Sequence, residues 1–256
     1  MSRPVALVIR APGSNRDGDA AFALDLVGAE PRRTLINEVF ANPKLLHEAQ
    51  LLVVPGGFSF ADALGAGRLF ALELVTRLRE ELNTFVDAGK PVIGICNGFQ
   101  VLVRTGLLPG DGNIVALGGN AAPGQPPGQF VCDWVTLQPA SKRCIWTSGL
   151  SEAIECPIAH GEGRLAADPD TLGALEANDQ IAFRYSGYNP NGSLADVAGI
   201  CDGTGLVLGL MPHPENHVLP RQHPHHLRGH RGGPTRGLNR GLGRALFAAG
   251  VNHAST

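Results

Sequence analysis

Short apolar runs alternate with helical patterns over the first hundred residues of the chain. Val5–Ile9, Leu51–Val54 and Val92–Ile95 are continuous apolar runs, as is typical of strands that are buried on both faces of a sheet. Between the last two, Arg68–Ala88 carries apolar residues at helical spacing, and Gly89 supplies its C-terminal cap. The alternation predicts an α/β protein with a mostly parallel central sheet flanked by helices.

The rest of the pattern completes this outline. Further helices are expected over Asp17–Val27 and Pro43–Ala49, and the stretch Leu108–Gln129, rich in Gly, Pro and Asn, predicts a loop. In the second half the expected strands are Phe130–Leu137, Glu155–Ala159, Ile181–Tyr185, Val197–Cys201 and Leu206–Met211. We expect these strands to continue the first sheet, so that residues 1–256 form a single domain.

Composition and charge argue against several classes of protein. Apolar residues make up 43% of the chain and charged residues 17%, which is enough apolar material for a buried core. The formal net charge of −2 gives no bias toward nucleic acid or membrane. No apolar run approaches the ~18 residues of a transmembrane helix, and Val5–Ile9 is too short for a signal peptide. We therefore expect a cytoplasmic protein that binds neither nucleic acid nor membrane.

The cysteines favour the same compartment. There are five, an odd number, and none forms a C-x-x-C pair. This spacing argues against a disulfide framework and against a structural zinc site, and favours reduced thiols. Four of them lie beside apolar or β-prone residues and are expected to be packing residues, whereas Cys96 lies in a different setting.

A basic segment stands out near the C-terminus. Residues 221–244 contain six Arg and four His but no acidic residue. One interpretation is a solvated loop before a final helix over residues 238–250. The other is a docking surface for an acidic partner or a phosphate-bearing substrate. The histidine spacing fits no standard site, so we expect no bound metal.

Cys96 is the strongest candidate for a reactive residue. It lies in Gly-Ile-Cys-Asn-Gly, between the expected strand Val92–Ile95 and a helical pattern that includes Phe99 and Leu102. A nucleophile on such a strand-to-helix turn needs small neighbours, because the turn is tight. A thiol at a helix N-terminus is also biased toward thiolate. The alternative is a buried cysteine in a glycine-rich loop.

A cysteine nucleophile requires a base, and His213 is the candidate. The apolar run Leu206–Met211 is followed by Pro-His-Pro-Glu, which places Glu215 two residues after His213. In extended backbone, side chains two apart point to the same side, and we expect the flanking prolines to keep the backbone extended. Glu215 then holds one imidazole nitrogen and leaves the other for the thiol. The alternative is a proline-rich turn with an incidental histidine.

Acyl transfer also needs donors for a developing oxyanion. Gly56 and Gly57 follow the strand Leu51–Val54, and the carboxyl end of that strand should lie at the same edge of the sheet as Cys96. We expect backbone N–H groups of Gly57 and Asn97 to point at the reacting oxygen. The alternative is an ordinary strand-to-loop turn.

These residues together resemble the class I glutamine amidotransferases. Within them, the chain more closely resembles the glutamine amidotransferase subunits of phosphoribosylformylglycinamidine synthase, over about residues 5–216. The similar segments are residues 12–17, 55–59, 94–100, 160–164, 188–193 and 209–215. The resemblance implies a flavodoxin-like fold and hydrolysis of L-glutamine to glutamate and ammonia through a cysteinyl thioester.

The resemblance also assigns roles to individual residues. Cys96 corresponds to the nucleophile, His213 to the general acid/base and Glu215 to its orienting partner, with Gly57 and Asn97 at the oxyanion hole. The residues expected to bind glutamine are Phe58, Gln100, His160, Gly161 and Glu162. For His160 and Glu162, a role in stabilising the loop is the alternative.

A partner and its cofactors follow from the resemblance as well. Ammonia would pass to a synthetase subunit that binds ATP, Mg²⁺ and formylglycinamide ribonucleotide, and a small third subunit would join the complex in de novo purine biosynthesis. The chain has no G-x-x-x-x-G-K-[ST] loop, so we expect no cofactor in the chain itself.

The chain departs from the family pattern at two places. Phe60-Ala61-Asp62 replaces the usual Tyr-Gly-Asp, and Asn216 replaces the usual Arg after His-Pro-Glu. Both changes are expected to affect partner docking rather than the triad. The competing hypotheses are another cysteine hydrolase of this fold, such as a γ-glutamyl hydrolase, and a non-catalytic regulatory subunit.

Overall fold

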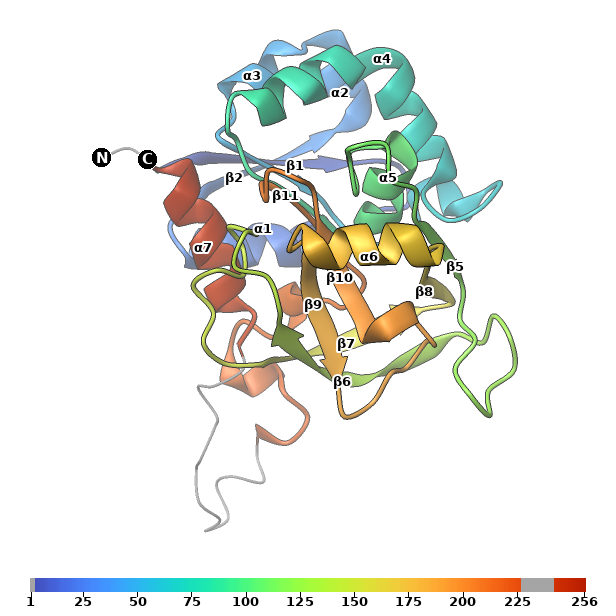
Figure 1. Cartoon of the computed structure of the whole chain (residues 1–256). Helices are drawn as coiled ribbons and strands as arrows, with labels where there is room; N and C mark the ends of the chain where they lie inside the picture. The colour runs from blue at the N-terminus through green and yellow to red at the C-terminus, as the bar shows by residue number, and fades with distance from the viewer. Residues whose placement is uncertain (1–2, 227–241) are drawn as a thin grey trace.

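Nine strands form the central sheet of the computed structural model, which describes residues 3–226 and 242–256. Their order across the sheet is β2-β1-β3-β4-β11-β10-β9-β6-β7 (Figure 1). The strands are β1 (Val5–Arg10), β2 (Glu30–Leu35), β3 (Leu51–Val54), β4 (Val92–Ile95), β6 (Val131–Pro139), β7 (Ile154–His160), β9 (Ile181–Ser186), β10 (Val197–Cys201) and β11 (Val207–Leu210). A second, two-stranded sheet pairs β5 (Ala116–Gly119) with β8 (Glu162–Ala166).

The central sheet changes character along its width. The strands from β2 to β11 pair in parallel, and those from β11 to β7 pair antiparallel. Every residue of β3, β4 and β11 is buried, as expected for strands covered on both faces. The predicted α/β class with a parallel core is confirmed, and the predicted second-half strands do continue the same sheet.

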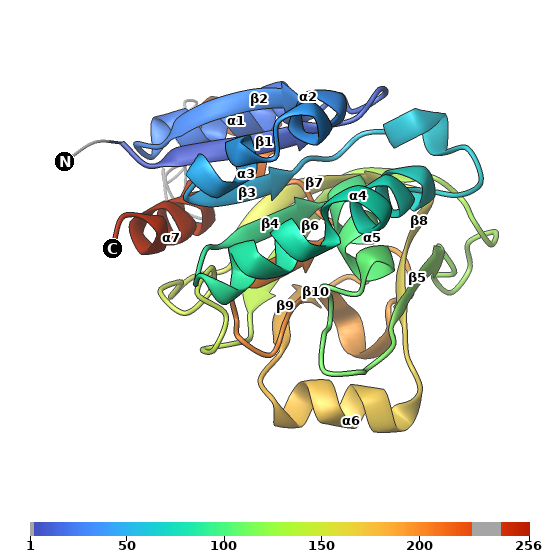
Figure 2. The same cartoon turned by 90° about the horizontal axis from the view of Figure 1, so that it is seen from above.

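Helices cover both faces of the parallel part of the sheet. They are α1 (Asp17–Leu26), α2 (Ile36–Ala41), α3 (Lys44–Glu48), α4 (Arg68–Asp87), α5 (Asn97–Thr105), α6 (Pro169–Ala177) and α7 (Arg244–Ala254). Figures 1 and 2 show α1 and α7 on one face, α3, α4 and α5 on the other, and α6 over the antiparallel part. No helix in the described ranges is both long and apolar enough to cross a membrane.

Several elements differ from the sequence-based outline. Glu30–Leu35 was not predicted as a strand, because it is a polar edge strand that pairs only with β1 and has no apolar run. The predicted loop Leu108–Gln129 contains β5, and β8 and α6 were also missed. Gly-rich β5 has little strand propensity of its own and is held by pairing with β8.

The C-terminal helix begins later than predicted. The prediction placed it over residues 238–250, but among the described residues α7 begins at Arg244 and runs to Ala254. Gly243 is pressed against the backbone of Pro214, and its N–H bonds the carbonyl of His217 at 2.8 Å. This contact fixes the start of α7. Residues 227–241, most of the basic segment 221–244, lie outside the described residues.

Candidate active site

Three strand ends bring the predicted reactive residues together. Gly56 and Gly57 follow β3, Cys96 follows β4, and His213 lies three residues beyond the end of β11. Because β3, β4 and β11 are parallel neighbours, their carboxyl ends meet at one edge of the sheet. The site is therefore placed by sheet topology.

Cys96 occupies a strained turn between β4 and α5. Its φ of 52° and ψ of −107° lie outside the regions that L-residues prefer. The turn packs so closely that a Cβ on Gly98 would lie 1.9 Å from the carbonyl oxygen of Val54, and one on Gly94 would lie 2.6 Å from that of Gly98. The thiol is almost buried, with 6% of the residue exposed. The predicted strand–turn–helix arrangement around Cys96 is therefore present.

His213 and Glu215 form a buried hydrogen-bonded pair. The distance between Nδ1 of His213 and Oε1 of Glu215 is 2.7 Å. A carboxylate can only accept, so Nδ1 carries the proton and Nε2 is left for a second partner. The expectation of an extended backbone was wrong: Pro214–Asn216 form a 3₁₀ turn, and this turn brings Glu215 back to the imidazole.

The charges around His213 set its protonation. Burial lowers its pKa, but the charges of Glu215 and Cys96, together with hydrogen bonds to both side chains, raise it to about 10. These interactions show that His213 contacts Cys96 on one side and Glu215 on the other. An imidazolium next to a thiol is the arrangement that stabilises a thiolate.

Gly56 and Gly57 lie against this pair. A Cβ on Gly56 would be 2.8 Å from Cε1 of His213, so only glycine lets the imidazole approach. Gly57 has a φ of +138°, and a Cβ there would lie 2.6 Å from the backbone nitrogen of Asn15. Asn97 is the first residue of α5, whose backbone N–H has no acceptor within the helix.

His160 lies next to the triad as a neutral histidine. Its Nδ1 is 3.2 Å from Oδ1 of Asn120, whose Nδ2 donates to the carbonyls of Gln129 and His160. Oδ1 of Asn120 is therefore an acceptor, and Nδ1 of His160 must be the donor. Burial, and then the charge of His213, lower the pKa of His160 to about 4. Its Nε2 is buried without a partner among the described residues.

The other residues expected to bind glutamine differ in burial and in hydrogen bonding. Gln100 is buried, and its Nε2 donates to the carbonyl of Glu162 at 2.5 Å while its Oε1 accepts from Asn97. Both ends of this carboxamide are thus engaged within the protein. The carbonyl of Gly161 accepts from Asn120, the Glu162 side chain is exposed, and Phe58 is 47% exposed beside Gly57.

Two buried asparagines were missed by the sequence analysis. Asn120 supports His160, and Asn191, with no exposed surface, donates to the carbonyl of Gly163 and to the hydroxyl of Tyr185. The only signals in the sequence were a Gly-Gly-Asn run and an Asn-Pro-Asn-Gly-Ser run. Such runs predict turns and give no indication that their amides are buried.

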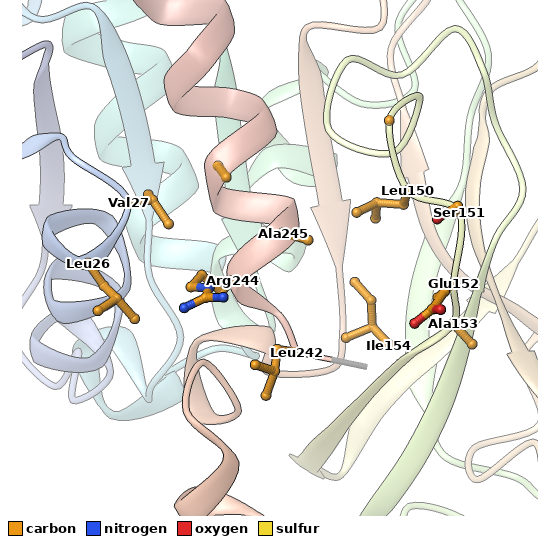
Figure 3. Close-up of a pocket in the computed structure, with 12 residues that line it drawn as sticks. Leu26, Val27, Leu150, Ser151, Glu152, Ala153, Ile154, Leu242, Arg244 and Ala245 are labelled. Carbon is orange, nitrogen blue, oxygen red and sulfur yellow. The ribbon is translucent and has the colours of Figure 1, made fainter. Parts of the chain in front are cut away.

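A cavity elsewhere in the molecule shares no residue with the triad. It measures about 480 Å³. Figure 3 shows the end of α1, with Leu26, on one side of α7 and the 150–154 segment on the other. Within the part of the chain that is described, no group of three or more His, Cys, Asp or Glu side chains is arranged to hold a metal.

Sequence comparisons agree on one family. The model of the CobB/CobQ-like glutamine amidotransferase domain matches residues 3–253. The chain is 50% identical over 244 residues to the phosphoribosylformylglycinamidine synthase subunit PurQ of Treponema denticola, covering 86% of this chain and 90% of that protein. It is 42% identical over 235 residues to the PurQ subunit of Dehalococcoides mccartyi, covering 88% and 89%.

Structural comparisons agree with the sequence. A chain in the structure of PurLQS from Thermotoga maritima superimposes with a TM-score of 0.74 and 31% identity, covering 98% of both chains. A glutamine amidotransferase from Thermotoga maritima gives a TM-score of 0.55 at 16% identity over the whole of both chains. The second similarity shows the fold alone.

Proposed function

Because the chain belongs to the CobB/CobQ-like glutamine amidotransferase family, and within it to the PurQ subunits of phosphoribosylformylglycinamidine synthase, we propose that it splits L-glutamine at Cys96. It is the glutaminase subunit of that synthase and supplies ammonia for purine biosynthesis. The observation that carries the site assignment is the chain of contacts from Cys96 through His213 to Glu215 at one sheet edge.

The geometry supports a two-step acyl transfer. The sulfur of Cys96 attacks the side-chain carbonyl carbon of glutamine, and the N–H groups of Gly57 and Asn97 stabilise the oxyanion. His213 gives its proton to the departing nitrogen, the C–N bond breaks, and ammonia and a thioester result. Water then attacks the thioester, His213 takes up a proton, the C–S bond breaks, and glutamate leaves.

The electrostatics suit the first step. The raised pKa of His213, about 10, favours the protonated imidazole next to Cys96. The acid that must protonate the leaving nitrogen is therefore already charged. The lowered pKa of His160, about 4, keeps that neighbour neutral, which avoids a second positive charge beside His213. We propose that His160, with Gln100, Phe58 and the 161–162 backbone, lines the glutamine pocket.

The relatives' names indicate the partners. The complex named PurLQS contains a subunit like this chain, and we propose that a synthetase subunit and a small third subunit bind this chain in the same way. ATP and Mg²⁺ would be held by the synthetase subunit. Apolar Phe58, next to Gly57, and Leu64, further along the same loop, are exposed at 47% and 74%, which is consistent with a partner that covers this loop. Five free cysteines support a cytoplasmic location.

Glutamine hydrolysis by the purified chain tests the proposal. We expect hydrolysis that rises sharply when a synthetase subunit and its ligands are added, and labelled glutamine should be trapped as a thioester. Cys96→Ala should abolish both signals, whereas Cys132→Ala, which removes an exposed thiol outside the site, should retain them. Absence of turnover in folded wild-type complex would overturn the proposal, as would turnover of larger γ-glutamyl substrates in place of glutamine.

A further inference from the structure

The segment that follows Gly57 has an unfavourable backbone conformation. In residues 58–64, here called the oxyanion loop, three consecutive non-glycine residues, Phe60, Ala61 and Asp62, have φ of 53°, 54° and 52°. Left-handed backbone is unfavourable for an L-residue, because its Cβ crowds the following carbonyl oxygen. Three such residues in succession therefore persist only where contacts with the surrounding structure hold the backbone in this conformation, as is common at functional sites.

The side chain of Asn97 supplies one of the two supports for this loop. Its Oδ1 accepts from the hydroxyl of Ser59 at 2.6 Å and from the N–H of Ser59 at 3.4 Å. Its Nδ2 donates to Oδ1 of Asp62 at 3.1 Å and to Oε1 of Gln100 at 3.1 Å. Asn97 is 3% exposed, and all four hydrogen-bonding positions of its carboxamide are used.

The turn before α1 supplies the other support. The N–H of Phe58 donates to the carbonyl of Gly13 at 3.1 Å, and the N–H of Phe60 donates to that of Pro12 at 2.6 Å. Gly57 itself lies so close to this turn that a Cβ would meet the backbone of Ser14 at 2.8 Å. Gly57 is thus held from one side by this turn, and the loop that follows it is held from the other side by Asn97.

Asn97 thereby links two groups that must act together. Its backbone N–H is one expected oxyanion donor, and its side chain anchors the loop that follows the other donor, Gly57. The two donors come from segments about forty residues apart, so nothing local in the sequence fixes their separation. Oxyanion donors are effective only at about 2.7–3.1 Å from the developing charge.

We propose that the Asn97 side chain is a positioning residue for glutamine cleavage, which holds the oxyanion loop so that the N–H groups of Gly57 and Asn97 converge on one oxygen. The proposal rests on the proposed function, because it concerns the same reaction. The carboxamide bonds Ser59, Asp62 and Gln100, and none of its hydrogen bonds goes to the thiol. It acts on the transition state through the loop, and its effect should therefore fall on kcat.

Asn97→Leu tests the role directly, because leucine fills the space and removes all four hydrogen bonds. A displacement of about 1 Å at a reacting group costs on the order of 10²-fold, so we expect a kcat loss of that size with KM for glutamine within about threefold. Alkylation of Cys96 by iodoacetamide needs no oxyanion hole, and its rate should stay unchanged. Asn83→Leu, on the exposed side of α4, is the matched control and should leave kcat unchanged.

An exchange of the two polar partners separates positioning from simple structural loss. Asn97→Asp places a carboxylate against Asp62, and kcat should fall as in Asn97→Leu. Asp62→Asn alone retains an acceptor for Asn97 and should cost only a few-fold. The double variant Asn97→Asp/Asp62→Asn restores the hydrogen bond with donor and acceptor reversed, so it should recover at least tenfold in kcat over Asn97→Asp.

The outcomes decide the proposal separately from the proposed function. Lack of glutamine turnover in the wild-type complex counts against the proposed function. If wild type is active and Asn97→Leu keeps full kcat, or if its loss lies in KM alone, the positioning role is overturned. The role is also overturned if the double variant recovers nothing while its near-ultraviolet circular dichroism and urea midpoint match those of the wild type.

Discussion

The triad and the pocket beside it are held in place by different means. Cys96 and His213 lie at the ends of neighbouring parallel strands, and their positions follow from backbone pairing and from glycines that admit no side chain. His160 and Gln100, in contrast, are held by buried carboxamides, those of Asn120 and Asn97. The first arrangement is fixed by the fold, and the second depends on individual hydrogen bonds.

The contrast has energetic consequences. The turns around Cys96 and Gly57 are so closely packed that they leave no space for an added side chain. Substitutions there should therefore act mainly on the rate of the chemical step. A buried polar network is stable only while every member is satisfied, and losing one partner leaves others unpaired at about 1–3 kcal/mol each. Substitutions in the network around His160 should therefore act mainly on stability and on substrate affinity, whereas the Asn97 side chain, which also anchors the oxyanion loop, should act mainly on kcat.

The largest effect should follow replacement of Glu215 by Gln in the triad. Glutamine can present its amide to Nδ1 of His213, which favours the wrong tautomer and removes the negative charge that raises the pKa of His213. The corresponding change in a serine-protease triad lowers kcat about 10⁴-fold, and we expect a loss of that order. The pH profile of kcat should also move to lower pH. A loss of less than tenfold in steady-state turnover would show that Glu215 does not orient the base.

The next effect concerns the backbone turn at Gly57. Alanine there must adopt a φ of +138° and contact the backbone of Asn15. The displaced N–H should lower kcat by about 10²–10³, the effect of removing one oxyanion donor, with little change in KM. Gly28→Ala is the matched control, because Gly28 also has a positive φ, +94°, but has nothing within 4 Å of its Cβ position. Equal kcat losses in both variants would remove the link between Gly57 and the oxyanion.

The residues at the ends of the parallel strands could be predicted from the sequence, whereas the buried hydrogen-bond network could not. Gly57, Cys96 and His213 could be predicted to lie at one sheet edge because each follows an apolar strand, and parallel strands place their carboxyl ends together. The strand Glu30–Leu35 was missed because it lies at the sheet edge and has no apolar run. It forms through its pairing with β1, and its own sequence gives no signal of this. Asn120 was missed because its role depends on partners distant in the chain, and no local pattern records such contacts.

The network contributes a pH-dependent term to stability through His160. Its pKa is about 4 when folded and 6.5 ordinarily, because burial disfavours the charged form. Above pH 6.5 both states are neutral; as the pH falls toward 4 only the unfolded state gains the proton, so stability is lost. At pH 5 the loss is about 2 kcal/mol relative to pH 7.

His160→Asn retains a donor for Asn120 and removes this titration. Urea unfolding at pH 7 and pH 5 should show a smaller loss of unfolding free energy in this variant than in wild type, by about that 2 kcal/mol. His47→Asn, at an exposed histidine, should behave as wild type. An identical pH dependence in wild type and His160→Asn would mean that His160 is not held neutral by the fold.

The smallest effect should come from Tyr185, which is buried near Cys96 but belongs to the network. Burial, and then the charges of Cys156 and Cys96, raise its pKa, so the phenol stays protonated and cannot serve as a base at neutral pH. Its hydroxyl accepts from Asn191 at 3.3 Å. Tyr185→Phe should therefore cost about 0.5–1.5 kcal/mol in unfolding free energy and leave kcat and its pH profile within about twofold of wild type. A tenfold drop in kcat with unchanged stability would place Tyr185 in the chemical step. The distinction between a triad held by backbone packing and a pocket held by buried carboxamides would then not apply to Tyr185.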